Sequence, residues 1–182
     1  ATQLLFTEGF DGNSDAQIAE ALHSKNSEVV AQAIHLATDP QRRSTHLATI
    51  RTIASRTQPA NVLLSLASCL QKIEGTERAG LASAMLGCAQ NARAIADENK
   101  LTLMTWYGIE PVVFSEGMLE LLDSNAKLQQ FAVRRLAYEI DTNPSVVAAA
   151  LEFIGTKAGS GNPDAEAAAA GLLGSDDRCA TS

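Results

Sequence analysis

Helix punctuation is the feature that most constrains what this chain can fold into. Three Asx-Pro pairs put a capping side chain directly before a proline, and they are Asp39-Pro40, Asn143-Pro144 and Asn162-Pro163. Proline at the first helical position loses no hydrogen bond, and an Asp or Asn before it can accept from N–H groups of the first turn. Residues 14–17, Ser-Asp-Ala-Gln, form a capping box. These signals predict a chain of short helices.

The apolar spacing between these starts has the period of a helix. Leu63, Leu66, Leu70 and Ile73 recur at steps of three and four residues. No stretch alternates apolar and polar residues between turn signals, so no strand is predicted. The expected helices cover residues 14–23, 27–38, 40–56, 59–73, 76–89, 91–105, 115–123, 125–141, 144–157 and 163–173. The prediction is an all-α chain of about ten short antiparallel helices stacked as hairpins.

The expected organisation is one helical domain with a short segment at each end. Residues 1–13 are expected to be an N-terminal arm, residues 14–173 the domain, and residues 174–182 a flexible C-terminal tail. Residues 106–114 are expected to interrupt the helices, because they contain Gly108 and Pro111.

A short internal similarity links two parts of the chain. Leu22-His23-Ser24 followed by residues 29–37 matches Leu122-Asp123-Ser124 followed by residues 129–137, and both second segments end in Leu-Ala. On residues 21–37 and 117–140 the chain resembles the HEAT and armadillo-like α-solenoids, whose repeats are helical hairpins. The resemblance implies an α–α superhelix. A compact α-bundle is the alternative, since the spacing of the pairs is irregular.

Composition and charge exclude several classes of protein. Hydrophobic residues make up 46% and charged residues 19%, which allows a sizeable core. The formal net charge of −7 argues against a nucleic-acid binder, which needs a basic face. Residues 101–113 are the longest stretch of low charge and fall short of the ~20 apolar residues of a membrane span. We expect no membrane contact.

The three cysteines favour a reducing setting. Cys69 and Cys88 lie in apolar helical patterns and are expected to be reduced core residues, with a disulfide between neighbouring helices as the alternative. Cys179 lies in the polar tail. An odd count is poor evidence for a disulfide framework and favours the cytoplasm. A processed secreted form fits the start at Ala1 as well.

No residue pattern points to catalysis, a cofactor or a metal. His23, His35 and His46 fall on three successive expected helices, and none shares a turn with a second ligand. They are expected to be ordinary, partly exposed histidines. The paired carboxylates lie in polar contexts, whereas a general acid needs burial to raise its pKa. The chain is therefore expected not to be an enzyme.

Two segments are candidates for binding. Trp106 and Tyr107 begin the interruption at residues 106–114, which either tucks under the helices or presents its aromatic rings to a partner. The other candidate is a strip on the expected helix 125–141, opposite its apolar stripe, where steps of three and four residues join Lys127, Gln130, Arg134, Tyr138 and Asp141. Arg135, next to Arg134, is included in the candidate site. Pairing of both arginines with Glu139 or Asp141 is the alternative. Comparable strips are Glu28, Gln32 and His35, and Asn61, Ser65, Ser68 and Lys72.

The expected function is a non-catalytic scaffold or interaction module that binds another protein or peptide through a helical-repeat groove. The first alternative is a helical protein that handles a small apolar ligand or a pigment. The second follows from the resemblance, because some HEAT-like proteins are DNA-repair glycosylases. The acidic charge speaks against that second alternative.

Overall fold

The computed structural model describes residues 14–40, 43–115, 117–122 and 125–139, and within these ranges the chain is all-α, as predicted. The chain divides into two compact units, residues 1–112 and residues 113–182, and each is described by itself.

Short helices make up both units, within the described residues. Unit 1 contains α2 (Ser14–Leu22), α3 (Ser27–Ala37), α4 (Arg43–Ala54), α5 (Ala60–Leu70), α6 (Gly75–Leu86), α7 (Ala89–Asp97), α8 (Asn99–Ile109) and the 3₁₀ helix η1 (Glu110–Val112). Unit 2 contains α9 (Met118–Leu121) and α10 (Ala126–Glu139).

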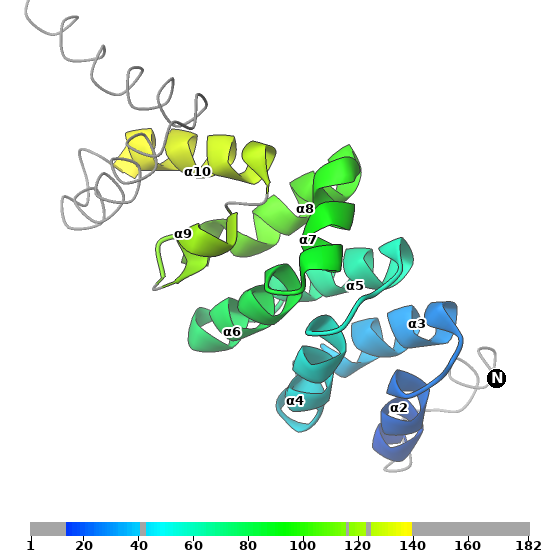
Figure 1. Cartoon of the computed structure of the whole chain (residues 1–182). Helices are drawn as coiled ribbons and strands as arrows, with labels where there is room; N and C mark the ends of the chain where they lie inside the picture. The colour runs from blue at the N-terminus through cyan, green and yellow to red at the C-terminus, as the bar shows by residue number, and fades with distance from the viewer. Residues whose placement is uncertain (1–13, 41–42, 116, 123–124, 140–182) are drawn as a thin grey trace, which may run out of the picture. The chain divides into compact units, whose positions relative to one another are not determined.

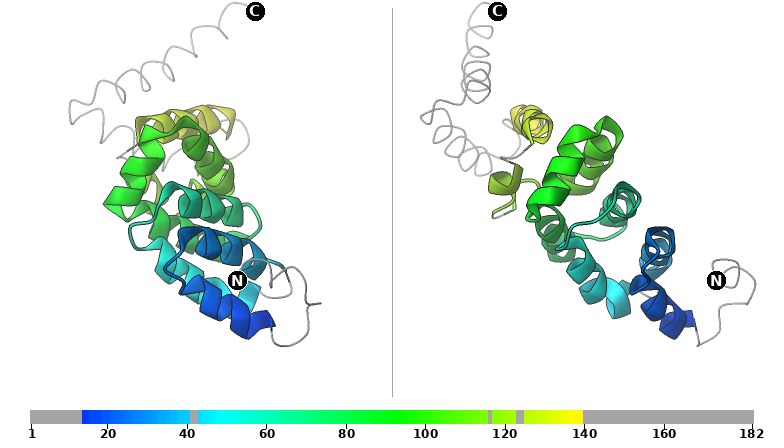
Figure 2. Two further views of the ribbon diagram at one scale, coloured as in Figure 1. Left: turned by 90° about the vertical axis from the view of Figure 1, so that its right-hand side faces the viewer. Right: turned by 45° about the vertical axis from the view of Figure 1, so that its right-hand side comes forward.

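The helices of unit 1 form two rows (Figures 1 and 2). Helices α3, α5 and α8 pack side by side in one row, and α2, α4 and α6 follow one another in the other. Helices α2 and α3 pair across the rows, and so do α4 and α5. Helix α7 is an addition between α6 and α8, and it packs on both. Unit 1 is therefore a stack of helical hairpins, as predicted.

Helix α5 is the centre of this stack. Leu63, Leu66, Leu70 and Ile73 form the predicted stripe and are completely buried. Val62 and Ala67 are buried on other sides of the helix, because α5 packs between α3 and α8 while also contacting the other row. Helix α5 is therefore covered on more than one side.

A glycine allows α8 to approach α5 closely. A Cβ atom at Gly108 would lie 2.6 Å from the Leu70 Cβ and 3.2 Å from the Ala67 carbonyl oxygen. A Cβ atom in a protein essentially never lies this close to another side chain, so the packing of α8 against α5 requires glycine at position 108. The interruption of the helices was expected to begin at residue 106. This start is wrong, because α8 continues to Ile109.

The expected helix 91–105 is two helices, and Thr102 explains the break. Helix α7 ends at Asp97, and Glu98 has an extended backbone. The Thr102 hydroxyl donates to the carbonyl oxygens of Ile95 and Glu98. The last carbonyl groups of a helix have no hydrogen-bond donor within that helix. The buried Thr102 hydroxyl supplies a donor to them, and this stabilises the end of α7.

Asp39 and Pro40 follow α3 as a bend and a turn, and α4 is described from Arg43. Residues 41–42, which would join Pro40 to α4, lie outside the described residues. The Thr38 hydroxyl donates to the carbonyl oxygens of Ile34 and His35 at 2.9 and 3.0 Å, so the turn is held by the end of α3. The arm at residues 1–13, the last two Asx-Pro pairs, the helices expected at 144–157 and 163–173, and the tail lie outside the described residues.

Asn91 on α7 holds the connection between α4 and α5. Its side-chain oxygen accepts from the Gln58 N–H at 2.9 Å. Its side-chain nitrogen donates to the carbonyl oxygens of Ala54 and Arg56, both at 2.9 Å. Asn91 is completely buried, so its amide depends on these backbone groups in place of water, and the bond to the Ala54 carbonyl is itself buried.

Alanine substitution at two helical glycines tests the close approach of α5 and α8. Alanine favours a helix interior by about 1 kcal/mol over glycine. We expect Gly108→Ala to lower the free energy of unfolding by about 1–3 kcal/mol, because Leu70 must move. Gly80→Ala is the matched control, since its Cβ would meet the flexible Arg51 guanidinium at 2.8 Å. Urea unfolding should show Gly80→Ala as neutral or stabilising, and equal effects would contradict this account.

Asn91→Ala tests the loop connection. We expect it to lower the free energy of unfolding by about 2–4 kcal/mol, because it removes one buried and two part-buried hydrogen bonds to the backbone. Asn61→Ala, which removes part-exposed hydrogen bonds, should cost less than about 1 kcal/mol. Equal losses for the two variants in urea unfolding would show that burial of the Asn91 bonds does not matter.

Candidate functional site

Helix α10 carries the candidate site of unit 2. The helix follows Asn125, whose side-chain oxygen accepts from the Leu128 N–H at 3.1 Å and so caps the first turn. Leu128, Ala132 and Leu136 are buried at steps of four residues. One side of α10 is thereby buried, and the opposite side is exposed.

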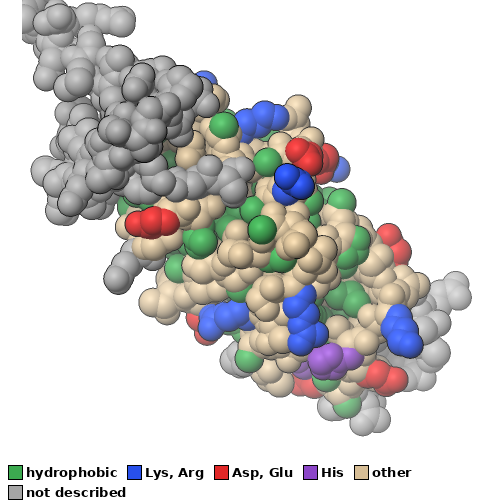
Figure 3. Space-filling model, in the orientation of Figure 1, with side chains coloured by type: hydrophobic (Ala, Val, Ile, Leu, Met, Phe, Trp, Pro, Cys, Tyr) green, Lys and Arg blue, Asp and Glu red, His purple; other side chains and the backbone are tan. Residues whose placement is uncertain are grey.

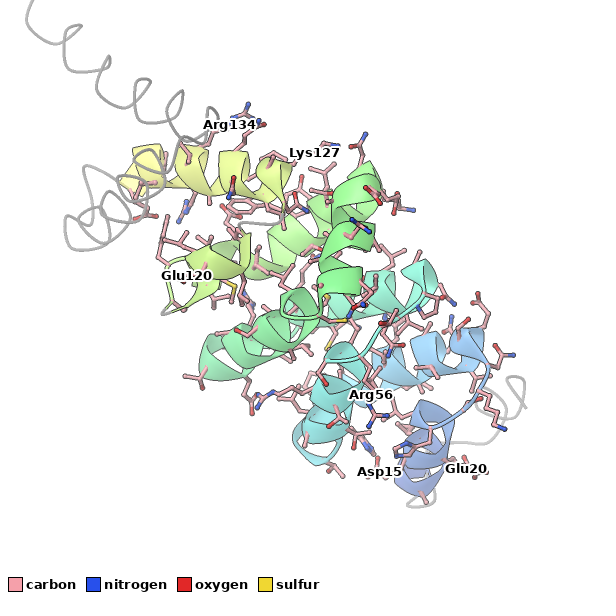
Figure 4. The ribbon with its side chains drawn as sticks, in the orientation of Figure 1. Asp15, Glu20, Arg56, Glu120, Lys127 and Arg134 are labelled. Atoms are coloured by element: carbon pink, nitrogen blue, oxygen red, sulfur yellow. The ribbon has the colours of Figure 1, made fainter. Side chains whose placement is uncertain are left out.

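Four polar and aromatic residues line that opposite side, and we call them the α10 strip. They are Lys127, Gln130, Arg134 and Tyr138, and all four are exposed. Steps of seven and four residues place Lys127, Arg134 and Tyr138 within about 40° of one another around the helix. Lys127 and Arg134 project from the same side of α10 (Figure 4). The face predicted from the sequence is therefore assembled on one helix.

Arg135 flanks the α10 strip and is held in place. It forms an ion pair with Glu139 one turn along, as the alternative interpretation of the sequence expected for this arginine. Its guanidinium carbon lies 5.5 Å from the centre of the Tyr138 ring, within the range of a cation–π contact. Tyr138 is nevertheless 73% exposed, the largest exposed fraction among the large hydrophobic side chains of the described residues.

The two aromatic candidates on α8 have different environments. Trp106 is only 8% exposed, so burial excludes it from a surface contact, and the tucked interpretation holds for this ring. Tyr107 is 56% exposed, and Leu103, one turn before it, is 42% exposed. Both belong to unit 1, whereas the α10 strip belongs to unit 2.

The comparable strips on α3 and α5 contact each other. The Asn61 side-chain nitrogen donates to the Glu28 carboxylate at 2.9 Å, and Ser65 Oγ lies 3.1 Å from His35 Nε2. Asn61 meets Glu28 near the start of both helices, and Ser65 meets His35 further along each, so the two helices run parallel. Much of the predicted polar surface is thus a set of contacts between neighbouring helices.

The surroundings of His35 change its acidity. Burial lowers the pKa of the imidazole below its ordinary value of 6.5, and the positive charge of Lys72 lowers it further. Both effects disfavour the protonated ring. His35 is therefore biased towards its neutral form at the contact with Ser65.

His46 corrects the expectation that the histidines are partly exposed. It is only 4% exposed, and its Nε2 lies 3.5 Å from the Asp15 carboxylate, which links α4 to α2. His23 is exposed. Among the described residues, no group of three or more His, Cys, Asp and Glu side chains could hold a metal ion.

The cysteines differ from each other in their surroundings. Cys69 and Cys88 are both thiols, and Cys69 is buried as expected. Cys88 is half-buried rather than in the core, because it stands at the turn between α6 and α7. Its Sγ lies 3.5 Å from Gln90 Oε1 and 4.0 Å from Thr57 Oγ1. Cys179 lies outside the described residues.

Charge is scattered on unit 1. On the part of its surface visible in Figure 3, acidic and basic side chains alternate with uncharged ones.

Within the described ranges, no helix is long and apolar enough to cross a membrane.

The sequence did not lead us to predict that Asn91 connects α7 to the segment between α4 and α5. Asn91 precedes the buried Ile95 by four residues, in register with the apolar side of α7. A polar residue in an apolar stripe was the available signal, because such a residue must find partners inside the protein.

Comparison with protein-family models, with curated proteins and with solved structures found no match to this chain.

A pH series tests the environment of His35. Because folding lowers the pKa of His35, its contribution to stability is present above the ordinary value of 6.5 and is lost as the pH falls below it. We expect His35→Gln to lose part of the wild-type decrease in melting temperature between neutral and mildly acidic pH. Lys72→Gln should weaken this pH dependence without removing it, because burial is the larger cause. An unchanged slope for His35→Gln would contradict the assignment.

Proposed function

We propose that this chain is a non-catalytic helical-repeat module, of the HEAT and armadillo-like kind, that binds another protein through the α10 strip. The observation that carries the proposal is the exposed alignment of Lys127, Arg134 and Tyr138 along one helix. A buried apolar stripe fixes the other side of α10, so the strip is presented on a rigid element.

The residue types of the strip support this function. Arginine and tyrosine are enriched among the residues that dominate binding energy, because both combine a large contact area with directional hydrogen bonds. Tyr138 is already restrained by Arg135, so ordering its ring on binding costs less conformational entropy. The stacked hairpins of unit 1 support the repeat assignment.

Affinity capture with a double variant tests the function. We expect Arg134→Glu with Tyr138→Ala to lose a partner that the wild-type chain retains from an extract of the source organism. Both side chains are exposed, so helicity and melting temperature should change little, with a cost below about 1 kcal/mol. The captured protein is then purified, and its direct binding to both forms is measured by calorimetry.

The matched control carries equivalent changes on unit 1. Arg93→Glu with Leu103→Ala reverses one exposed arginine and truncates one exposed apolar side chain. We expect this control to retain the partner. A partner lost equally with both variants, or a lower melting temperature for the α10 variant, would refute binding through the α10 strip.

A further inference from the structure

We propose that the exposed side of α8 binds a second copy of this chain, with the two α8 helices antiparallel and centred on position 105. The inference goes beyond the proposed function, because it concerns a surface of unit 1 and does not involve the α10 strip.

Four residues form a line along α8, and we call them the α8 stripe. They are Lys100, Leu103, Tyr107 and Glu110. Steps of three, four and three residues place them within about 80° of one another around the helix. Glu110 directly follows the last residue of α8 and keeps a helical backbone, with φ −45° and ψ −47°. This alternation of three and four is the spacing of the seam between two paired helices.

The middle of the α8 stripe is apolar and in contact with water. Leu103 is 42% exposed and Tyr107 is 56% exposed, and in the described part of unit 1 these are the large hydrophobic side chains that are exposed. Met104 lies next to Leu103 and is half-buried. Covering this surface would remove apolar area from water, so the middle of the stripe favours an apolar occupant.

The two ends of the α8 stripe carry opposite charges. Lys100 is exposed at the start of the helix, and Glu110 is half-buried at its end. Glu110 already interacts within its own chain. A carboxylate can accept about four hydrogen bonds, so a lysine from a second chain adds to these contacts. Asp97 and Glu98 precede α8, and the backbone of Glu98 is extended, so neither continues the helical register of the stripe.

The α8 stripe is complementary to itself when it is turned end to end. In an antiparallel pair centred on position 105, Lys100 lies opposite Glu110 of the second copy. Leu103 then lies opposite Tyr107 of the second copy, and two-fold symmetry repeats each contact. Helices packed in this way lie about 8–10 Å apart, a distance that lysine and glutamate side chains can span. The order of charges and the apolar middle therefore favour a second copy as the occupant.

Sedimentation velocity of the full 182-residue chain tests the inference. Stable interfaces bury about 800 Å² per partner, whereas the α8 stripe is one side of an 11-residue helix. We therefore expect a weak dimer, with a Kd of about 10–300 µM. Salt at about 0.15 M screens the repulsion between two chains that each carry a net charge of −7. A reducing agent prevents disulfides between chains through Cys88 or Cys179.

Charge reversal tests the antiparallel pairing. We expect Lys100→Glu and Glu110→Lys each to weaken the dimer by about tenfold, because each replaces two attractions by two repulsions. The double variant Lys100→Glu with Glu110→Lys should restore it, since the opposite charges again meet. An equal mixture of the two single variants should associate more tightly than either variant alone. If Glu110→Lys lowers the melting temperature, Lys100→Arg tests the same pair from its exposed end and should retain the dimer.

Truncation of the aromatic ring tests the apolar middle. We expect Tyr107→Ala to weaken the dimer by about tenfold, because a central tyrosine contributes much of the binding energy of an interface. Tyr138→Ala is the matched control, since it removes the same side chain from α10 and should leave the dimer unchanged. Both tyrosines are exposed, so both variants should keep the wild-type melting temperature. Each monomer carries the α10 strip, so Tyr107→Ala should still retain a partner captured through that strip.

Several outcomes would overturn the inference. One is a wild-type chain that stays monomeric up to about 500 µM, whether unit 2 or another protein covers the α8 stripe. Others are an unchanged dimer with Lys100→Glu, no restoration by the double charge reversal, and equal loss of the dimer with Tyr107→Ala and Tyr138→Ala. Loss of a captured partner with the α10 double variant, while the dimer persists, leaves both proposals standing on separate surfaces.

Discussion

The burial of α5 between α3 and α8 is the constraint on which unit 1 depends. Helices packed on both sides can approach closely only where side chains are small or absent. Gly108 meets that condition against Leu70 and Ala67, and it allows α8 to extend the row begun by α3 and α5. With α5 enclosed, Leu63 and Leu66 are removed completely from water, and burial of such side chains is the main favourable term in folding.

The polar residues of the two units have different surroundings. In unit 1, Glu28 and His35 face a neighbouring helix, so Asn61 and Ser65 use their polar groups between α3 and α5. Helix α10 has one buried side, and its other side keeps cations and an aromatic ring in contact with water. The contact between Arg135 and Tyr138 orders that ring before any partner arrives.

The sequence predicted the all-α class, the buried stripe of α5 and the exposed side of α10, because each follows from a local period of 3.6 residues. The predictions from the sequence were wrong where a contact with another part of the chain determines where a helix ends. Gly108 was interpreted as a helix breaker, since the approach of Leu70 is invisible in a linear pattern. The break at Glu98 was missed because Thr102, within the next helix, compensates for it. The α10 strip is one helical face, so the sequence could predict its members, whereas the burial of Trp106 depends on packing.

Asn91 has a consequence for how unit 1 opens. In stacked hairpins each pair contacts mainly its neighbours, so pairs can in principle separate one at a time from an end. The three hydrogen bonds of the buried Asn91 side chain join α7 to backbone groups 33 to 37 residues earlier in the chain. Opening of the hairpin α4–α5 away from the α6–α8 segment must therefore break these hydrogen bonds as well as the helix packing. The α2–α3 pair is joined to its neighbour by the packing of α3 on α5, so separating this pair would bring buried side chains such as Ile34 and Leu63 into water.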